Sequence, residues 1–334
     1  MSKSTQPLLT IILPLYNAGE DVQSLFASLS MQENIDSKKI DILVVDDGSS
    51  DATLEYVQKY TPLLSDYRSV AVVKNKSNLG LSKTRHIGAT TSTAKFITFV
   101  DKKTRPDPDY IYSFLAKNRN IIIGSPYISK QRGIWPRVLS LVRKKLYWPY
   151  FNNDFEDVDL DRQAYVKFKN KGGGGAMLVL RKYYVKISSK QSHNPNVNDD
   201  SKFIEELAAI EPILKTNDAR TEYLNRTGHT ENVLHLFNRG PKFIDYYFTK
   251  DSRFLPFILG LIMLPPAFIA IYIYSATLVL ALFAVGAIAI LVLSIYVSED
   301  LTDLYSALLI LPVSLIAFCA GVYKGLFMKI TNRY

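Results

Sequence analysis

The sequence predicts an α/β domain with a mostly parallel sheet, followed by C-terminal transmembrane helices. Two observations carry this prediction. From about residue 8 to residue 105, continuous apolar runs alternate with amphipathic helical patterns, as in strands joined by right-handed crossovers. The last quarter of the chain, in contrast, contains two long stretches without any charged residue, 254–298 and 304–323.

The alternation can be followed element by element. The runs LTIILPLY, IDILVVDD, SVAVVKN and KFITFVD are predicted to be four strands, because buried parallel strands are apolar on both faces. Apolar residues recur at helical spacing in the segments 21–31, 52–60 and 81–92 between them. Three strands end in polar clusters: Tyr16-Asn17, Asp46-Asp47 and Asp101. Ligands bind at the carboxyl ends of strands in such sheets, so we expect these clusters to form one site.

Composition limits the classes of function. The chain has 334 residues, enough for one large domain or two smaller ones. Its single cysteine excludes an internal disulfide framework and suits a reducing compartment. The formal net charge of +9 is compatible with nucleic acid, an anionic membrane surface or phosphorylated substrates as partners. We predict a catalytic domain over residues 1–245 and a membrane domain over residues 246–334.

The uncharged stretches indicate a multi-pass membrane protein. As one helix, the first would reach roughly 65 Å, about twice a bilayer core of ~30 Å. We therefore expect it to fold back, which gives spans at about 254–274, 276–298 and 304–323. The Pro-Pro pair at 265–266 is expected to kink or break the first span. The alternative is a very apolar, buried helix pair in a soluble protein.

A basic segment precedes these spans. Residues 130–145 include six basic side chains and no acidic one, interleaved with apolar residues such as Trp135 and Val142. As a helix this segment has an apolar stripe and a basic face, which is typical of a segment on an anionic membrane surface. An ordinary amphipathic helix packed on the protein is the alternative. No nucleic-acid-reading module is recognisable in the sequence, so we expect no nucleic-acid partner.

Two weaker motifs follow. In KGGGGAMLVL four glycines lead into an apolar strand, and glycine there either lets backbone approach a ligand closely or supplies a flexible loop. In NDDSKFIEEL, Asp199 and Asp200 begin a helical pattern.

Taken together, six segments resemble the family-2 glycosyltransferases in order and approximate spacing: TIILPLYN, ILVVDDGSSD, NLGLSKTRHIGA, FVDKKTRPDPDY, GGGGAMLVLRK and NDDSKFIEEL. These enzymes have the Rossmann-like, nucleotide-sugar-binding fold called GT-A. The resemblance covers roughly residues 8–240, and VVDDGSSD with PLYN ahead of it is its most specific part. The chain looks especially like membrane-anchored bacterial members that build exopolysaccharide or cell-wall glycans.

The resemblance implies a nucleotide-sugar site. Asp47 matches the family's uracil-binding aspartate, so a UDP-sugar is the expected donor. Asp101 matches the first acid of the Asp-x-Asp motif, which holds a divalent metal, Mn or Mg, on the diphosphate. Arg85 stands where family members direct a basic side chain at the nucleotide. The implied donor-binding residues are Pro14, Tyr16, Asn17, Asp46, Asp47, Arg85 and Asp101, and Asp101 is also the candidate metal ligand.

The resemblance also implies the catalytic residues. Asp200 matches the acid of the family's Glu-Asp pair, the general base, with Asp199 beside it. By the same resemblance, the wall near the sugar and the acceptor is expected to be formed by Gly173, Gly174, Gly175 and Met177.

Each of these residues also has a structural interpretation. Asp199 and Asp200 can cap a helix N-terminus, where acids are favoured. Asp46 and Asp47 can open a tight turn before Gly48. Arg85 can be a surface salt-bridge partner.

The sequence departs from the family pattern at two places. Lys103 stands where the Asp-x-Asp motif has its second acid. Alternate residues of an extended strand point to the same side, so we predict that Lys103 lies beside Asp101 and that Lys102 points away. We also predict that Lys103 takes over much of the metal's role and belongs to the donor-binding residues. Activity should then depend only weakly on Mn or Mg. The second departure is ENVLHLFNRG, which leaves only Arg239 of the usual Gln/Arg-x-x-Arg-Trp motif and puts processive polymerisation in doubt.

These residues predict an inverting glycosyltransferase that moves a sugar from a nucleotide-sugar to a lipid-linked glycan acceptor. The reaction needs a carboxylate to take the acceptor's proton and positive charge to stabilise the leaving diphosphate. The main alternative is a catalytically degenerate member that acts as a nucleotide-sugar-binding or scaffold protein. A transporter is disfavoured because the spans carry no charge, and a nucleotidyltransferase because PLYNAGED lacks a Gly-rich phosphate loop.

The predicted location is the cell membrane, with the catalytic domain in the cytoplasm, where nucleotide sugars are made. Lys250 and Arg253 before the first span agree with the positive-inside rule. The C-terminal tail is also basic, through Lys324, Lys329 and Arg333, yet three crossings would place it on the opposite side.

Overall fold

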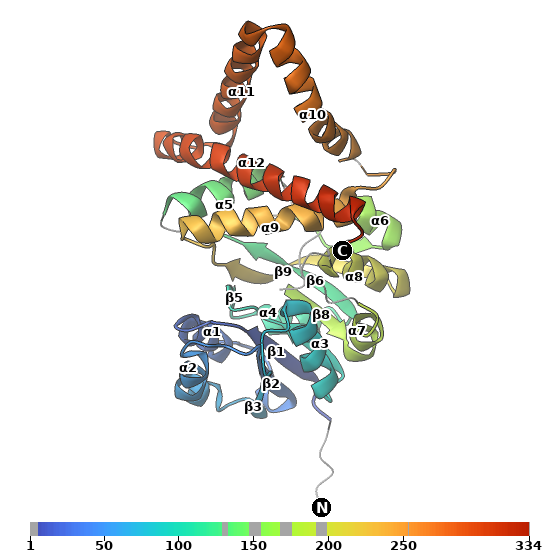
Figure 1. The fold of residues 1–334 in the computed structure, drawn as a ribbon. Coiled ribbons are helices and arrows are strands. Elements are labelled where there is room, and N and C mark those ends of the chain that lie inside the picture. Colours follow the sequence, from blue (N-terminus) through green and yellow to red (C-terminus); the bar gives the residue numbers. More distant parts are fainter. Residues whose placement is uncertain are drawn as a thin grey trace, which may run out of the picture. The chain divides into compact units, whose positions relative to one another are not determined.

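The computed structural model of the protein describes residues 6–128, 133–146, 155–167, 176–191, 199–252 and 254–333. The described residues form two compact units (Figure 1). Unit 1 comprises the described residues up to 128, together with 155–167, 176–191 and 199–224, and unit 2 comprises 133–146 and everything described from 225 onward.

Unit 1 is an α/β unit built on one sheet. Its strands are β1 (Leu9–Leu15), β2 (Ile40–Asp46), β3 (Ser69–Lys74), β4 (Phe96–Phe99), β5 (Thr104–Pro106), β6 (Ile121–Tyr127), β7 (Val158–Leu160), β8 (Met177–Leu180) and β9 (Ile213–Tyr223). Its helices are α1 (Asp21–Ser30), α2 (Thr53–Tyr60), α3 (Leu81–Thr91), α4 (Tyr110–Ala116), α6 (Arg162–Lys167), α7 (Arg181–Ser188) and α8 (Asp199–Ile210), with 3-10 turns at Ser37–Lys39 and Thr61–Leu64. The four strands and three helices predicted before residue 105 are confirmed.

The strand order is β3-β2-β1-β4-β8-β6-β9-β5, with β7 paired to β9. The four strands β3, β2, β1 and β4 run parallel to one another, as predicted. β8 then runs antiparallel to both β4 and β6, and β5 and β7 are antiparallel to β9. The sheet is therefore parallel in its first half and mixed in its second, where the sequence pattern is least regular. This mixed α/β arrangement keeps the predicted fold class.

Two apolar layers hold the sheet between helices. Residues of β1 and β2 that point to one face pack against α1, α2 and α4, in a core that includes Ile11, Phe26 and Phe114. The opposite face packs against α3, α7 and α8, in a core that includes Ile12, Tyr184 and Leu207. Figure 1 shows α1 and α2 on one side of the first strands and α3 and α7 on the other. Because successive side chains of a strand point to opposite faces of the sheet, each buried strand contributes residues to both cores.

Unit 2 consists of helices: α5 (Ile134–Leu146), α9 (His229–Tyr247), α10 (Leu255–Tyr274), α11 (Ala276–Val297) and α12 (Leu301–Ile330). The three predicted spans correspond to α10, α11 and α12, each long and apolar enough to cross a membrane. The chain folds back at Ser275, between the predicted spans, and α10 is not broken at Pro265 and Pro266. The sequence puts α5 and α9 in the catalytic domain, whereas in the structure both belong to unit 2.

α9 and α12 approach each other unusually closely. A Cβ on Gly240 would lie 1.9 Å from the carbonyl carbon of Gly321, and a Cβ on Gly321 would lie 2.0 Å from the carbonyl oxygen of Phe237. Only glycine allows this backbone contact. The helix pair is further supported by cores around Ile244 and Val322 and around Trp135 and Ile310.

Candidate active site

The predicted polar clusters meet at the carboxyl edge of the parallel strands. β2, β1 and β4 are neighbours, so Asn17, Asp46 and Asp101 follow or end adjacent strands. The loops after β1 and β2 are bound to each other: the backbone N–H of Asn17 donates to Ser49 Oγ at 3.0 Å, and the backbone N–H of Ser50 donates to Asn17 Oδ1 at 2.9 Å. Asn17 adopts a left-handed conformation, φ 43°, which asparagine tolerates well. The three strand ends therefore lie together at one edge of the sheet.

Asp46 and Asp47 are both buried, but they differ in how their oxygens are used. Asp47 Oδ1 accepts hydrogen bonds from Asn75 Nδ2 and from the backbone N–H of Leu79, each at 2.9 Å, and Oδ2 accepts one from the N–H of Gly80. Asp47 therefore holds the loop before α3, which differs from the tight turn before Gly48 that the structural interpretation assigned to it. Among the described residues, Asp46 Oδ2 is buried and has no hydrogen-bond partner.

Gly48 completes this arrangement. Its φ of 70° is left-handed, and a Cβ there would lie 2.6 Å from the carbonyl carbon of Ser77. Any side chain at this position would push the loop at Ser77 away from the end of β2.

Arg85 joins the two acids that the sequence assigns to metal binding and to catalysis. Its Nη2 contacts both oxygens of Asp101, at 3.0 and 2.9 Å, and its Nη1 donates to Asp200 Oδ1 at 3.2 Å. The Arg85 side chain is 6% exposed, that of Asp101 is 27% exposed and that of Asp200 is 59% exposed. Arg85 is thus a salt-bridge partner, as one interpretation expected, but a buried one. Asp101, α3 and the start of α8 are fixed to one another through this side chain.

The guanidinium of Arg85 stays charged in this position. Burial alone would lower its pKa, but the negative charges of Asp101 and Asp200 more than offset burial and raise the pKa above its ordinary value. The ring of Phe99, whose centre is 5.5 Å from Arg85 Cζ, adds a cation–π contact.

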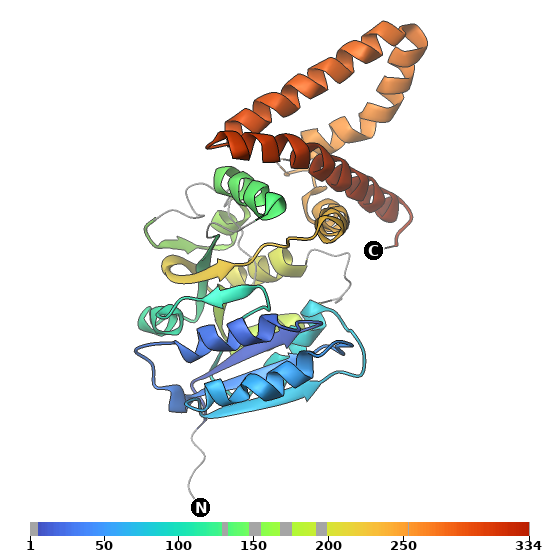
Figure 2. The same ribbon diagram turned by 90° about the vertical axis from the view of Figure 1, so that its left-hand side faces the viewer.

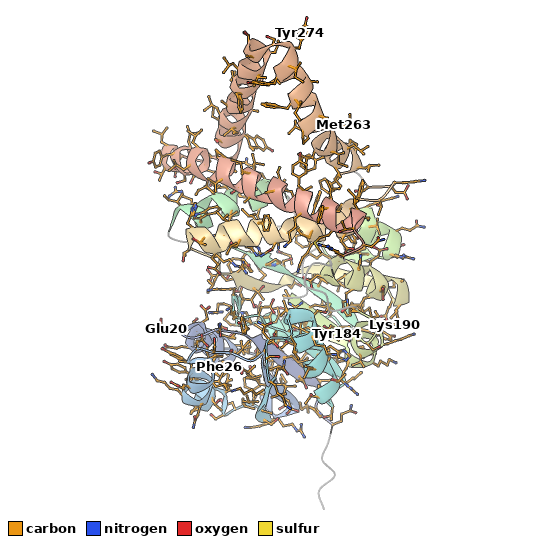
Figure 3. All side chains as sticks on the ribbon, in the orientation of Figure 1. Glu20, Phe26, Tyr184, Lys190, Met263 and Tyr274 are labelled. Carbon is orange, nitrogen blue, oxygen red and sulfur yellow. The ribbon has the colours of Figure 1, made fainter. Side chains whose placement is uncertain are left out.

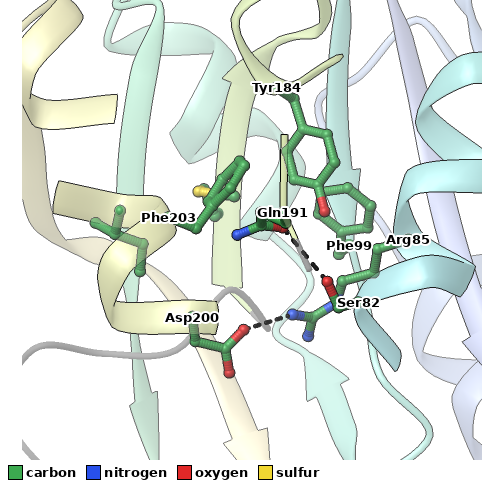
Figure 4. Close-up of a pocket in the computed structure, with 9 residues that line it drawn as sticks. Ser82, Arg85, Phe99, Tyr184, Gln191, Asp200 and Phe203 are labelled. Carbon is green, nitrogen blue, oxygen red and sulfur yellow. Dashed lines mark hydrogen bonds and ion pairs between the residues drawn. The ribbon is translucent and has the colours of Figure 1, made fainter. Parts of the chain in front are cut away.

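A small cavity adjoins this ion-pair network (Figure 4). Figure 4 shows Asp200 directed toward Arg85, with Gln191 drawn between Phe203 on the left and Tyr184 on the right. Tyr184 lies against both Phe99 and Phe203, at ring-centre distances of 4.7 and 4.6 Å. The cavity is lined by Ser82, Arg85, Phe99, Met177, Tyr184, Gln191, Asp200, Phe203 and Ile204.

The prediction for the two lysines after Asp101 is wrong in geometry. Lys103 Nζ pairs with Asp21 Oδ2 at 2.9 Å, and the cation beside Asp101 is Arg85. Lys102, expected to point away, donates to the carbonyl oxygens of Tyr16 and Asn17, each at 2.7 Å. The reason lies in the local backbone: the N–H of Thr104 donates to the Asp101 carbonyl at 2.9 Å. This turn replaces the extended strand on which the prediction depended.

The sequence model described as "Glycosyl transferase family 2" matches residues 10–178, which is just over half of the chain. The chain belongs to this family.

Curated relatives are similar to the chain only in part. "Glycosyltransferase GlyA" of Streptococcus pneumoniae is 29% identical over 123 residues, covering 36% of this chain and 17% of that protein. "Uncharacterized glycosyltransferase YibD" of Escherichia coli is 34% identical over 101 residues, covering 30% of this chain and 27% of that protein. The chain thus spans well under a third of the length of these two relatives.

A solved structure shares the fold. The mannosyltransferase PcManGT from Pyrobaculum calidifontis, solved in complex with GDP-Man and Mn2+, is 14% identical, with a TM-score of 0.63 over 98% of this chain and 89% of its own. The unit 1 fold is accordingly of the GT-A type.

The described residues do not fit the metal site that the family's Asp-x-Asp motif usually supplies. Both oxygens of Asp101 face Arg85, and position 103 carries an amine that cannot ligate a cation while protonated. Among the described residues, no three His, Cys, Asp or Glu side chains are grouped as metal ligands. We therefore derive no catalytic step through a metal.

The other predicted residues are placed as follows. Pro14 is buried inside β1, and Tyr16 is 41% exposed just after this strand. Met177 is buried at the start of β8 and lines the same cavity as Asp200. Gly173, Gly174, Gly175 and the side chain of Asp199 lie outside the described part of the chain.

Sequence reasoning missed several residues of this region. Tyr184, Gln191 and Phe203 line the cavity, and Asp21 pairs with Lys103. Tyr184 and Phe203 lie in helices with ordinary amphipathic patterns, so nothing in the sequence distinguishes them from core residues. Asp21 could have been noticed in the sequence, because it is an acid at the start of a predicted helix. An acid in that position beside a strand end is a natural partner for a lysine such as Lys103.

Proposed function

We propose that this glycosyltransferase transfers a sugar, with inversion, from a UDP-sugar to a lipid-linked glycan during polysaccharide or cell-wall glycan synthesis. The observation that carries the proposal is the Asp101–Arg85–Asp200 network at the carboxyl edge of the parallel strands. This network supports the proposal because it holds a half-exposed carboxylate, suited to proton transfer, close to the ends of these strands.

Asp200 is the proposed general base. Its Oδ1 is held by Arg85, and its side chain is 59% exposed, so Oδ2 can face an acceptor hydroxyl. The hydroxyl attacks C1 of the donor sugar as its proton passes to Asp200, and the nucleoside diphosphate leaves from the opposite face. Arg85 acts as a positioning residue, because its second arm anchors it to Asp101.

Positive charge for the leaving diphosphate is proposed to come from the protein. The candidate is Lys102, whose ammonium lies at the carbonyl oxygens of Tyr16 and Asn17 after β1, whereas Lys103 is paired with Asp21. A fixed ammonium stabilises a developing phosphate charge as a point charge, more strongly in a partly buried site than in water. On this basis we expect only a weak dependence of turnover on Mn or Mg.

Recognition of the base is proposed at the loops after β1 and β2. Asp47 fixes the loop before α3, and the buried Asp46 Oδ2 retains an unused acceptor. Burial of an unpaired carboxylate oxygen is unfavourable, and an imide N–H of uracil would supply the missing donor. Because PcManGT was solved with a guanine nucleotide, both UDP- and GDP-sugars belong in the test.

The lipid-linked acceptor is supported by the apolar helices. α10 and α11 have mean hydropathies of 2.2 and 3.0, values that favour membrane insertion and would serve no purpose for an enzyme acting on soluble glycans.

The test uses the full chain in lipid nanodiscs. A panel of nucleotide-sugars is first screened for binding, and release of nucleoside diphosphate is then measured with lipid-linked and soluble acceptors. We expect release only when a binding donor and a lipid-linked acceptor are both present. Equal release with a soluble glycan would refute the lipid acceptor. Donor binding without release under every condition would favour a degenerate, donor-binding protein.

A further inference from the structure

α12 differs from the two apolar helices that precede it. In its most apolar window, 39% of the residues are buried inside the protein, against 6% for α10 and 11% for α11. It has 30 residues, about 45 Å as a helix, whereas α10 and α11 have 20 and 22 residues, about 30 and 33 Å. Only α10 and α11 match the ~30 Å hydrocarbon thickness of a bilayer.

α10 and α11 form a hairpin whose two ends rest on different parts of α12 (Figure 2). At the first end, the carbonyl oxygen of Leu261 accepts a hydrogen bond from Tyr323 Oη at 2.6 Å. At the second end, Val297 belongs to the same apolar cluster as Ala307 and Ile310. Ala307 and Tyr323 are sixteen residues apart, about 24 Å along the helix axis. α12 therefore runs across the base of the hairpin, as both ribbon views show.

The tip of the hairpin lies far from this base. Tyr274 is 85% exposed and Met263 is 62% exposed, and Figure 3 shows both on the outside of α10. No residue from 254 to 298 is charged, so the tip carries no charged side chain.

α9 packs along α12 and brings charges with it. A Cβ on Gly325 would lie 2.8 Å from Pro241 Cα, and Lys324 Nζ lies 5.2 Å from the ring centre of Phe237. On the same stretch of α9, Arg239 and Lys242 are exposed, and neither has an ion-pair partner among the described residues. If α12 crossed the bilayer here, α9 and these two charges would enter the hydrocarbon core with it, where an unpaired charge is strongly disfavoured.

From these contacts we infer that α12 lies in the plane of the membrane surface, and that only α10 and α11 cross the bilayer. The partner surface is the lipid bilayer itself, which covers the side of α12 that faces away from α9. That side is exposed and apolar over the whole helix: Leu301, Tyr305, Leu309, Ile316, Phe327 and Ile330 are between 46% and 83% exposed.

Charge complementarity supports this placement. Near the start of α12, three acids are paired with basic side chains of α5: Asp300 and Asp303 with Arg137, and Glu299 with Lys144. Two crossings return the chain to the side from which it entered. Lys250 and the basic tail, including Lys329, then lie on one side of the membrane, and the uncharged tip of the hairpin lies on the other. This arrangement satisfies the positive-inside rule at both ends, which three crossings cannot do.

Sidedness can be tested with single cysteines in the full chain. The one native cysteine is first replaced by Cys319→Ser, and cysteines are then introduced separately as Ser65→Cys in unit 1, Ser275→Cys at the hairpin tip and Asn332→Cys near the C-terminus. Each variant is labelled with a membrane-impermeant maleimide in intact and in permeabilised cells. We expect the Ser65 and Asn332 variants to share one labelling pattern and the Ser275 variant to show the other.

The outcome does not depend on which side unit 1 faces. Labelling of the Asn332 variant from the side opposite to the Ser65 variant would mean three crossings and would overturn the inference. Labelling of all three variants from one side would mean that the hairpin does not cross, which also overturns it.

The depth of α12 gives an independent readout. Spin labels at Leu301, Ile316 and Ile330, all strongly exposed, report collision with oxygen and with a water-soluble nickel chelate. A helix in the plane gives the same shallow depth at all three positions. A crossing helix gives a deep label at Ile316 and two labels at opposite surfaces, which would contradict the inference.

Discussion

Arg85 is expected to couple strongly to Asp101 and weakly to Asp200. Its contact with Asp101 involves both carboxylate oxygens, at 2.9 and 3.0 Å, and the arginine is almost fully buried. Loss of one partner of such a pair typically costs about 3–5 kcal/mol, part of which is desolvation rather than coupling. The contact with Asp200 is a single bond at 3.2 Å to a carboxylate that is 59% exposed, and exposed pairs contribute about 0–1 kcal/mol.

Two double-mutant cycles in the full chain measure these couplings separately. Arg85→Met is combined with Asp101→Asn in one cycle and with Asp200→Asn in the other. Local stability is read from hydrogen exchange of the α3 and β4 amides in detergent micelles. We expect a coupling of about 2–3 kcal/mol for Arg85 with Asp101 and below ~1 kcal/mol for Arg85 with Asp200.

Equal couplings, or a larger one with Asp200, would refute the view that Asp101 anchors Arg85 while Asp200 stays free for chemistry. The same variants also separate structure from catalysis. Asp200→Asn should leave stability nearly unchanged and lower turnover by ~10²-fold or more, whereas Asp101→Asn should lower both.

Three further predictions follow from contacts elsewhere in the chain. Turnover should persist in EDTA, and strict manganese dependence would contradict the finding that the described residues do not fit a metal site. Lys102→Ala should lower turnover more than Lys103→Ala, because the Lys102 ammonium lies at the Tyr16 and Asn17 carbonyls whereas Lys103 pairs with Asp21. Gly240→Ala should destabilise unit 2 by about 1–3 kcal/mol, since its Cβ would overlap Gly321, whereas Gly260→Ala has nothing within 4 Å and should be neutral in the same thermal unfolding assay. Burial lowers the pKa of Lys215, which donates to the Gly124 carbonyl, to about 7, while the unfolded chain keeps this proton to about pH 10. Between these two pH values the unfolded state binds more protons than the folded state, so the free energy of unfolding should rise with pH from about 7 to about 10. At ~1.4 kcal/mol per pKa unit the rise is up to roughly 5 kcal/mol, and Lys215→Met should abolish it.

The first half of the fold could be predicted because its strands are apolar on both faces. β1, β2 and β4 are continuous buried runs that end in polar residues, and these features alone predict parallel strands with a site at their carboxyl edge. The antiparallel entry of β8 and the pairing of β9 with β5 and β7 depend on long-range contacts that leave no local pattern.

The sequence singles out two acids of the candidate site but does not predict which side chains they pair with. Asp101 and Asp200 were identified from their motifs, yet the sequence paired Asp101 with Lys103. The backbone N–H of Thr104 donates to the Asp101 carbonyl, and this hydrogen bond forms a turn where a strand was expected. Because of this turn, the ammonium groups of Lys102 and Lys103 reach other partners. Arg85 reaches Asp101 from α3, sixteen residues earlier, and only the packing of α3 on the sheet brings them together.

The membrane helices were predicted by composition, but their roles were not. Hydropathy assigns α12 the same character as α10 and α11. What distinguishes α12 is its close backbone contact with α9 at glycine residues of both helices. The sequence does not reveal this contact, because glycines in one helix do not indicate which other helix they will pack against.

Acceptor-dependent release of nucleoside diphosphate by Asp200→Asn, compared with the native chain and with Asp199→Asn, tests the central claim most directly. The native chain should release nucleoside diphosphate from the donor that it binds. Asp200→Asn should lose ~10²-fold or more of this turnover while its donor affinity stays unchanged, because an amide cannot take the proton. Asp199→Asn should retain most of the activity. Unchanged turnover in Asp200→Asn, or a loss confined to Asp199→Asn, would contradict the assignment of Asp200 as the base.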